Sequence, residues 1–144
     1  MKFTAIFLFV LAFVCGFSAA AVAAEEKPKE VKIFKAAIDK DGVQRVEILG
    51  GGYFFNPDRI IVKVNVPVEL KLRKEAGVVP HDIVMKSPEA GIDFRISMHE
   101  EPQIIRFTPN KPGVYPFYCS KKLLFFESHR EKGMEGILEV VEQH

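Results

Sequence analysis

The stretch QIIRFTPNKPGVYPFYC, residues 103–119, decides the fold, because it has the pattern of a strand, a tight turn and a second strand. QIIRFT and VYPFYC are short runs rich in β-branched and aromatic residues, and PNKPG between them holds the proline and glycine typical of turns. Similar short apolar runs, separated by turn formers, continue along most of the chain. We therefore predict an all-β protein, a sandwich or a barrel.

Working outward from this stretch, the sequence predicts strands at 31–39 and 43–49, split by the turn DKDG, and at 81–85 and 136–142. Residues 59–74 alternate between apolar and polar, which indicates two strands or one strand bent at Pro67. Residues 86–102 contain turn formers and mixed polarity, so we expect mostly loop there. SKKLLFFESHREKG, residues 120–133, is rich in helix formers and ends at Gly133, which predicts a short helix before the last strand.

The N-terminus has the pattern of a secretory signal peptide over residues 1–24. Lys2 precedes a continuous apolar run, and Val22-Ala23-Ala24 forms a small-residue cleavage site before Glu25. An uncleaved membrane anchor is the alternative, since the apolar run is long enough to span a bilayer. We favour cleavage, which removes Cys15 and predicts a periplasmic or secreted protein that does not contact the membrane afterwards. Residues 25–49 would then supply N-terminal strands, and residues 50–144 the main domain.

Without the signal peptide the chain is electrically balanced. Lys2 is the one basic residue lost, so Lys and Arg fall from 20 to 19 and equal the 19 Asp and Glu. A neutral chain of about 120 residues gives no reason to expect a nucleic-acid partner, and it is long enough to form a core without disulfides. Cys119 is then the one cysteine left. A lone thiol is a liability in an oxidising compartment unless something, such as a metal ion, holds it.

Three further residues could join Cys119 in a metal site. His129 and Met134 follow it with nine and then four residues between them, and His81 opens the strand at 81–85. Each has an ordinary explanation when taken alone: a buried apolar cysteine, a surface histidine, a core methionine and a strand-end histidine. Together, a thiolate, two imidazoles and a weak axial thioether form the ligand set that suits copper moving between Cu(I) and Cu(II).

On these residues the chain resembles the cupredoxins, the small blue copper proteins. HDIVM, FTPNKPGVYPFYC and GILEVVE occur in the family's order, and GGYFFNPDRIIVKVNVPVEL resembles its N-terminal half, so the likeness covers roughly residues 50–142. The resemblance implies a Greek-key β-sandwich, one copper ion and the ligands His81, Cys119, His129 and Met134. The related cupredoxin-like module of periplasmic iron-uptake proteins shares this fold without being a simple electron carrier.

The chain departs from the simplest family members in its ligand loop. Those proteins place two to four residues between the cysteine and the second histidine, whereas here there are nine. Leu123 stands where binuclear copper domains need a second cysteine, which disfavours a binuclear centre. A carboxylate from Glu127 or Glu131 could replace Met134 as the fourth ligand, as in red copper sites, so the spectral class stays open.

The insertion carries four consecutive apolar residues, Leu123 to Phe126. If exposed, they would form a docking surface for a redox partner; if buried, they would pack the enlarged loop onto the sandwich. We expect at least two of the four to be buried. The surrounding cations, interleaved with acidic residues, are expected to form an ordinary solvated rim.

Three functions fit the sequence. The first is an exported single-electron carrier that transiently meets a cytochrome or an oxidoreductase, the second a copper-binding or delivery module, and the third a cupredoxin-like structural domain. We expect no enzymatic activity, because the sequence has no Ser-His-Asp arrangement, no phosphate-binding glycine loop and no carboxylate pair.

Overall fold

The computed structural model describes residues 30–143. The predicted signal peptide, the alternative membrane anchor and Cys15 lie outside these residues. Within residues 30–143, no helix has the length and hydropathy needed to cross a membrane.

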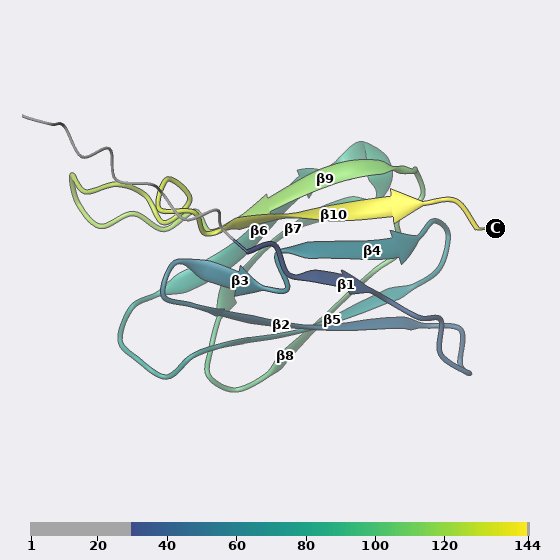
Figure 1. The fold of residues 1–144 in the computed structure, drawn as a ribbon, viewed down its shortest axis with the longest axis horizontal. Helices are drawn as coiled ribbons and strands as arrows, with labels where there is room; N and C mark the ends of the chain where they lie inside the picture. The colour runs from purple at the N-terminus through teal and green to yellow at the C-terminus, as the bar shows by residue number, and fades with distance from the viewer. Residues whose placement is uncertain (1–29, 144) are drawn as a thin grey trace, which may run out of the picture.

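The described chain is built from two β-sheets that pack face to face (Figure 1). A six-stranded sheet has the order β1-β4-β10-β9-β6-β7, and a four-stranded sheet has the order β3-β2-β5-β8. The strands are β1 (Ile33–Lys35), β2 (Gln44–Gly51), β3 (Phe54–Asn56), β4 (Arg59–Lys63), β5 (Val68–Lys74), β6 (His81–Ser87), β7 (Ile92–Met98), β8 (Gln103–Phe107), β9 (Gly113–Tyr118) and β10 (Glu135–Val141). The one helical element among the described residues is the three-residue 3-10 turn η1 (Pro88–Ala90). The prediction of an all-β sandwich is confirmed.

Alternating side chains from both sheets form the core. Along β2 and β5, every second residue is buried, including Ile48 and Leu72, as expected for strands with one face inward. Phe117 on β9 is fully buried and meets the ring of Phe55 edge to face at a centroid distance of 5.3 Å. Burial of these apolar faces supplies the main stabilisation of the sandwich.

A buried polar side chain ties the two sheets together. Gln44 on β2 is fully buried, and its Nε2 donates to the carbonyl of Lys63 on β4 at 3.1 Å. Its Oε1 accepts from the amide of Lys63 at 2.6 Å. Because both polar ends of the amide have partners, its burial carries no penalty for an unpaired group.

The strand order brings distant parts of the chain to one end of the six-stranded sheet. β9 ends at Tyr118, which pairs with Glu135 at the start of β10 and with Val84 on β6. β6 begins at His81, so its first residue lies at the same end as Cys119, which follows β9. The segment between β9 and β10 projects beyond both sheets there, as the yellow-green loop at the left of Figure 1 shows.

Two local expectations are wrong. Residues 86–102 are not mostly loop, because Ile92–Met98 form β7, which pairs with all seven residues of β6 at the sheet edge. Residues 120–133 form consecutive turns and no short helix. The alternation of residues 59–74, by contrast, is resolved as two strands, with the chain turning at Asn65 (φ +58°) ahead of Pro67.

Candidate metal centre

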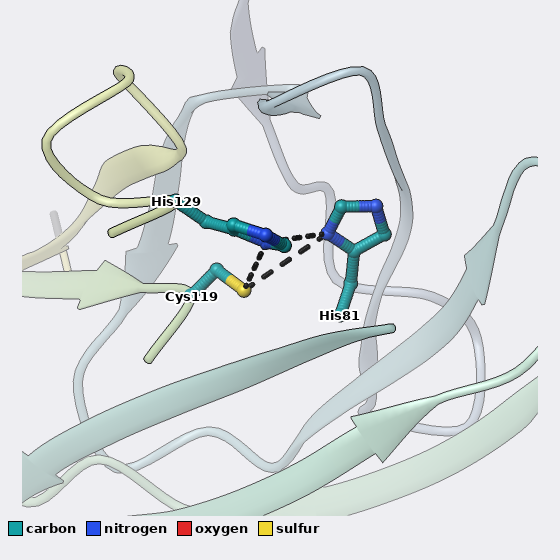
Figure 2. Close-up of side chains that lie close together, drawn as sticks. All are labelled: His81, Cys119 and His129. Carbon is teal, nitrogen blue, oxygen red and sulfur yellow. Dashed lines mark hydrogen bonds between the residues drawn. The ribbon is translucent and has the colours of Figure 1, made fainter. Parts of the chain in front are cut away.

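His81, Cys119 and His129 converge at the end of the sandwich, and all three are buried. Their side chains point at one another (Figure 2). The Nδ1 atoms of the two histidines lie 3.2 Å apart, and the Cys119 Sγ lies 3.5 Å from Nδ1 of His129 and 4.0 Å from Nδ1 of His81. The three residues thus present two ring nitrogens and one sulfur to a common point.

These separations fit a metal ion. Typical metal–nitrogen and metal–sulfur bonds are about 2.0 and 2.3 Å, so an ion between such ligands allows separations of up to about 4 Å. One thiolate and two imidazoles in a trigonal arrangement form a donor set that is typical of copper. The donor atoms and the distances between them are therefore both compatible with a bound copper ion.

The nine-residue insertion returns His129 to the site through a narrow neck. The amide of His129 donates to the carbonyl of Lys121 at 2.9 Å, and Lys122 and Ser128 form an isolated antiparallel bridge. Beyond this neck, residues 123–127 form an outward lobe. The length of the lobe does not displace His129, because Lys122 and Ser128 pair with each other just before the histidine.

Met134 also lies at this end of the sandwich and is fully buried. Its carbonyl accepts from the amide of Cys119 at 3.0 Å, and its amide donates to the carbonyl of His129 at 2.9 Å. Its terminal methyl and the thioether of Met98 both lie over Gly50, where a Cβ would come within 3.2 Å of Met134 Cε and 3.0 Å of Met98 Sδ. Met134 as a ligand stays a prediction.

The two carboxylates considered as alternative ligands are exposed and do not belong to this cluster. Glu131 is exposed, and its Oε2 accepts from both the amide and the hydroxyl of Ser128, at 2.6 and 2.7 Å. Glu127 is exposed and lines a cavity with a volume of about 510 Å³ on the outer side of His129. Among the described residues, neither glutamate belongs to the group of metal-capable side chains around Cys119.

A buried carboxylate lies directly behind the cluster. Asp82 is 1% exposed, and its amide contacts the Cys119 Sγ at 3.5 Å. Its Oδ1 accepts from the amide of Ser120 and its Oδ2 from the Ser120 hydroxyl, both at 2.6 Å, while Arg95 Nε lies 3.2 Å from Oδ2. We did not predict this arrangement from the sequence. The one indication in the sequence is that Asp82 directly follows His81 and Ser120 directly follows Cys119.

Burial shifts the ionisation of all three converging side chains toward the neutral form. Desolvation lowers the pKa of His81, with the charge of His129 as a further cause, and it lowers the pKa of His129, with that of Lys132 as a further cause. Burial raises the pKa of the Cys119 thiol. Without a metal the site therefore favours neutral imidazoles, the form that binds metals, and a protonated thiol.

The lowered histidine pKa values predict a pH dependence for the metal-free protein. The unfolded chain takes up protons near the ordinary histidine pKa of about 6.5, whereas the folded protein resists them. The free energy of unfolding therefore has its full value above about pH 6.5. It decreases as the pH drops through this value toward the lower histidine pKa values of the folded protein. Thermal denaturation of the metal-free protein between pH 7.5 and 5 should show this loss, and His129→Gln should reduce it; an unchanged melting temperature across the range would contradict it.

The residues of the outward lobe are all exposed, so the expectation that at least two of Leu123 to Phe126 are buried is wrong. Leu123, Leu124, Phe125 and Phe126 are 64%, 76%, 85% and 51% exposed. The neck explains the difference, because it holds the lobe away from the sheets. We call these four residues the apolar lobe. Val78 and Val79 are exposed as well and line the same cavity as Leu123, Phe126 and His129.

The sandwich and its cluster define the class: the chain has the cupredoxin fold. Among solved structures it is similar to the metal-binding domain of the Cu(I)-exporting P-type ATPase CopA of Streptococcus pneumoniae D39, with 25% identity and a TM-score of 0.57 over 78% of this chain and 99% of that one. It is similar to a copper-binding protein in its apo form, with 25% identity and a TM-score of 0.53 over 75% and 96% of the two chains. Auracyanin B shares the fold, with 17% identity and a TM-score of 0.51 over 74% and 94%. No protein-family model and no curated protein sequence matches the chain.

Proposed function

We propose that this protein is exported, binds one copper ion through His81, Cys119, His129 and Met134, and carries single electrons. The observation that carries the proposal is the buried convergence of two imidazole nitrogens and one thiol within 4.0 Å of one another. Copper bound there would supply a one-electron couple between Cu(II) and Cu(I).

The protein's own residues account for the other requirements of electron transfer. His81 is fixed at the start of β6, Cys119 by its amide hydrogen bond to Met134 directly after β9, and His129 by the hydrogen bond at the neck. The ligands would therefore need little movement when the charge of the ion changes. Cys119 would lose its thiol proton on binding the metal, and this loss makes the affinity rise with pH. All three side chains are buried, which limits their contact with water.

A redox partner would contact the end of the molecule that carries the apolar lobe. This end presents exposed apolar side chains directly outside His129, an arrangement suited to brief contact with another protein such as a cytochrome or an oxidoreductase. Export through the segment 1–24 would place the protein in the periplasm or outside the cell.

The test of this proposal is a titration of the purified protein with Cu(II), followed by absorption and electron paramagnetic resonance, and then by voltammetry. We expect one equivalent of copper, an intense visible band from thiolate-to-copper charge transfer and a reversible one-electron couple. Stoichiometric copper without colour, or the absence of any copper binding, would overturn the proposal.

Copper delivery is the second candidate, and it is favoured by the 25% identity to a metal-binding domain of a Cu(I)-exporting ATPase. A delivery module would release Cu(I) rapidly to a competing chelator and would show no reversible couple. A chelator-exchange time course beside the voltammogram separates the two functions.

Gly50→Ala probes the contribution of Met134. The new Cβ would press on Met98 Cε at 2.9 Å and on Met134 Cε at 3.2 Å, and both are flexible ends that can move at modest cost, on the order of 1 kcal/mol. We expect a small change in the melting temperature of the metal-free protein but altered copper resonance and absorption. Identical spectra for the variant and the parent would argue against an axial role for Met134.

A further inference from the structure

We propose that the Asp82 carboxylate, held in place by Ser120 and Arg95, sets the balance between Cu(II) and Cu(I) at the site. Its negative charge would favour the oxidised ion and lower the reduction potential. This inference rests on the proposed copper site and assigns a role to a residue outside the ligand set.

The carboxylate is nearly enclosed and fully engaged. Asp82 is 1% exposed, and both of its oxygens accept hydrogen bonds from Ser120, one from the amide and one from the hydroxyl, each at 2.6 Å. Arg95 on β7 reaches the same group, with Nε 3.2 Å from Oδ2 and a second nitrogen on the Ser120 hydroxyl. These contacts hold the carboxylate in one position.

The position is next to the candidate ligands in two ways. Asp82 follows His81 in β6, and its amide contacts the Cys119 Sγ at 3.5 Å. Ser120, which binds both carboxylate oxygens, follows Cys119. The carboxylate therefore links the segment that carries His81 to the segment that carries the thiol.

A fixed charge here acts differently on the two oxidation states. Cu(II) carries one more positive charge than Cu(I), so a nearby carboxylate stabilises it more, and this preference lowers the potential. The effect is strong because little water lies around Asp82 to screen it.

Two cations face the carboxylate and oppose this effect in part. The side chain of Arg95 is 59% exposed, and Lys121, whose Nζ lies 4.0 Å from Oδ2, is 34% exposed. Solvent screens these exposed charges more than it screens the enclosed carboxylate, so the carboxylate should dominate at the metal. Removing Arg95 should then act in the direction opposite to removing the charge of Asp82.

The experiment measures the reduction potential of the copper-loaded protein in Asp82→Asn and Arg95→Met. Asparagine has the shape of aspartate and keeps one oxygen for the Ser120 amide. We expect Asp82→Asn to raise the ratio of Cu(I) to Cu(II) affinity by about tenfold or more, which is about 59 mV for one electron. Arg95→Met should lower the potential, with the midpoint falling rather than rising.

Matched controls come from the neighbouring pair on the same two strands. Lys86 and Asp93 form an exposed ion pair at 2.7 Å. Lys86 lies four residues after Asp82 on β6, and Asp93 lies two residues before Arg95 on β7. Asp93→Asn and Lys86→Met change the same charges farther from the site. Both should leave the potential within a few millivolts of the parent.

The outcomes separate this inference from the function on which it rests. A parent protein without any reversible copper couple overturns the proposed function. A normal parent couple with unchanged potentials in both Asp82→Asn and Arg95→Met, or shifts of equal size in the Asp93 and Lys86 controls, overturns the role of Asp82 alone. If Asp82→Asn fails to fold by circular dichroism, the sign of the shift in Arg95→Met decides.

Discussion

Cys119→Ser is expected to abolish the visible charge-transfer band of the copper-loaded protein and to weaken copper binding more than about a hundredfold. Loss of residues that merely orient metal ligands costs about 10- to 100-fold in affinity, and Cys119 is the one sulfur in the converging group. A hydroxyl is similar in size to a thiol but a poor ligand for copper, especially for Cu(I). The measurement is a Cu(II) titration followed by absorption, with a competing chelator for the affinity.

The comparison that makes this result specific is His99→Gln. His99 belongs to the described residues but lies outside the converging group and is exposed. The substitution removes an imidazole from the surface and should leave band, stoichiometry and affinity unchanged. A Cys119→Ser protein that keeps the band, or a His99→Gln protein that loses it, would place the copper elsewhere.

Phe117→Ala is expected to destabilise the metal-free protein by about 3–5 kcal/mol. The phenyl ring is fully buried beside Phe55, and its removal leaves a cavity that the surrounding strands can fill only in part. Phe117 lies two residues before Cys119 on β9, so the loss should also weaken the end of the strand that supports the thiol. Urea denaturation followed by circular dichroism measures the change.

Phe125→Ala makes the same chemical change in a different environment. Phe125 is 85% exposed on the apolar lobe, so its truncation should alter the free energy of unfolding by less than about 0.5 kcal/mol. Comparable losses for the two variants would mean that the lobe packs onto the sandwich in solution.

The strands could be predicted wherever turn residues separate short apolar runs, as around Pro112 and Gly113. β7 was missed although Ile92, Phe94, Ile96 and Met98 alternate with polar residues, because neighbouring turn formers hid the two-residue period. It pairs with β6 in a hairpin around η1, with Ser87 opposite Ile92. β3 was missed because its three residues are too few to show a period.

The ligand set was predicted from the order of residues and from the resemblance to the cupredoxins, whereas the convergence of the side chains was not predictable from spacing alone. Nine residues between Cys119 and His129 suit a helix, a lobe or an open loop equally well. The neck hydrogen bond from His129 to Lys121 selects the lobe, and it joins backbone atoms, which no side-chain pattern reports. The same neck leaves the four apolar residues exposed, a result contrary to the usual tendency of such side chains to be buried.

The Asp82 arrangement escaped prediction for another reason. An aspartate in a strand is usually read as a solvent-facing residue, since carboxylates are seldom fully buried. Here the hydrogen bonds from Ser120 and the contact with Arg95 offset the cost of burial, so the net pKa of Asp82 lies below its ordinary value although desolvation alone would raise it.

The neck between Lys121 and His129 separates the exposed residues 123–127 from the position of the His129 side chain. Since the backbone is already closed before the histidine, residues 123–127 can change in number and kind while the nitrogen keeps its place beside the sulfur. The surface that the lobe presents can thus vary independently of the metal-capable side chains behind it.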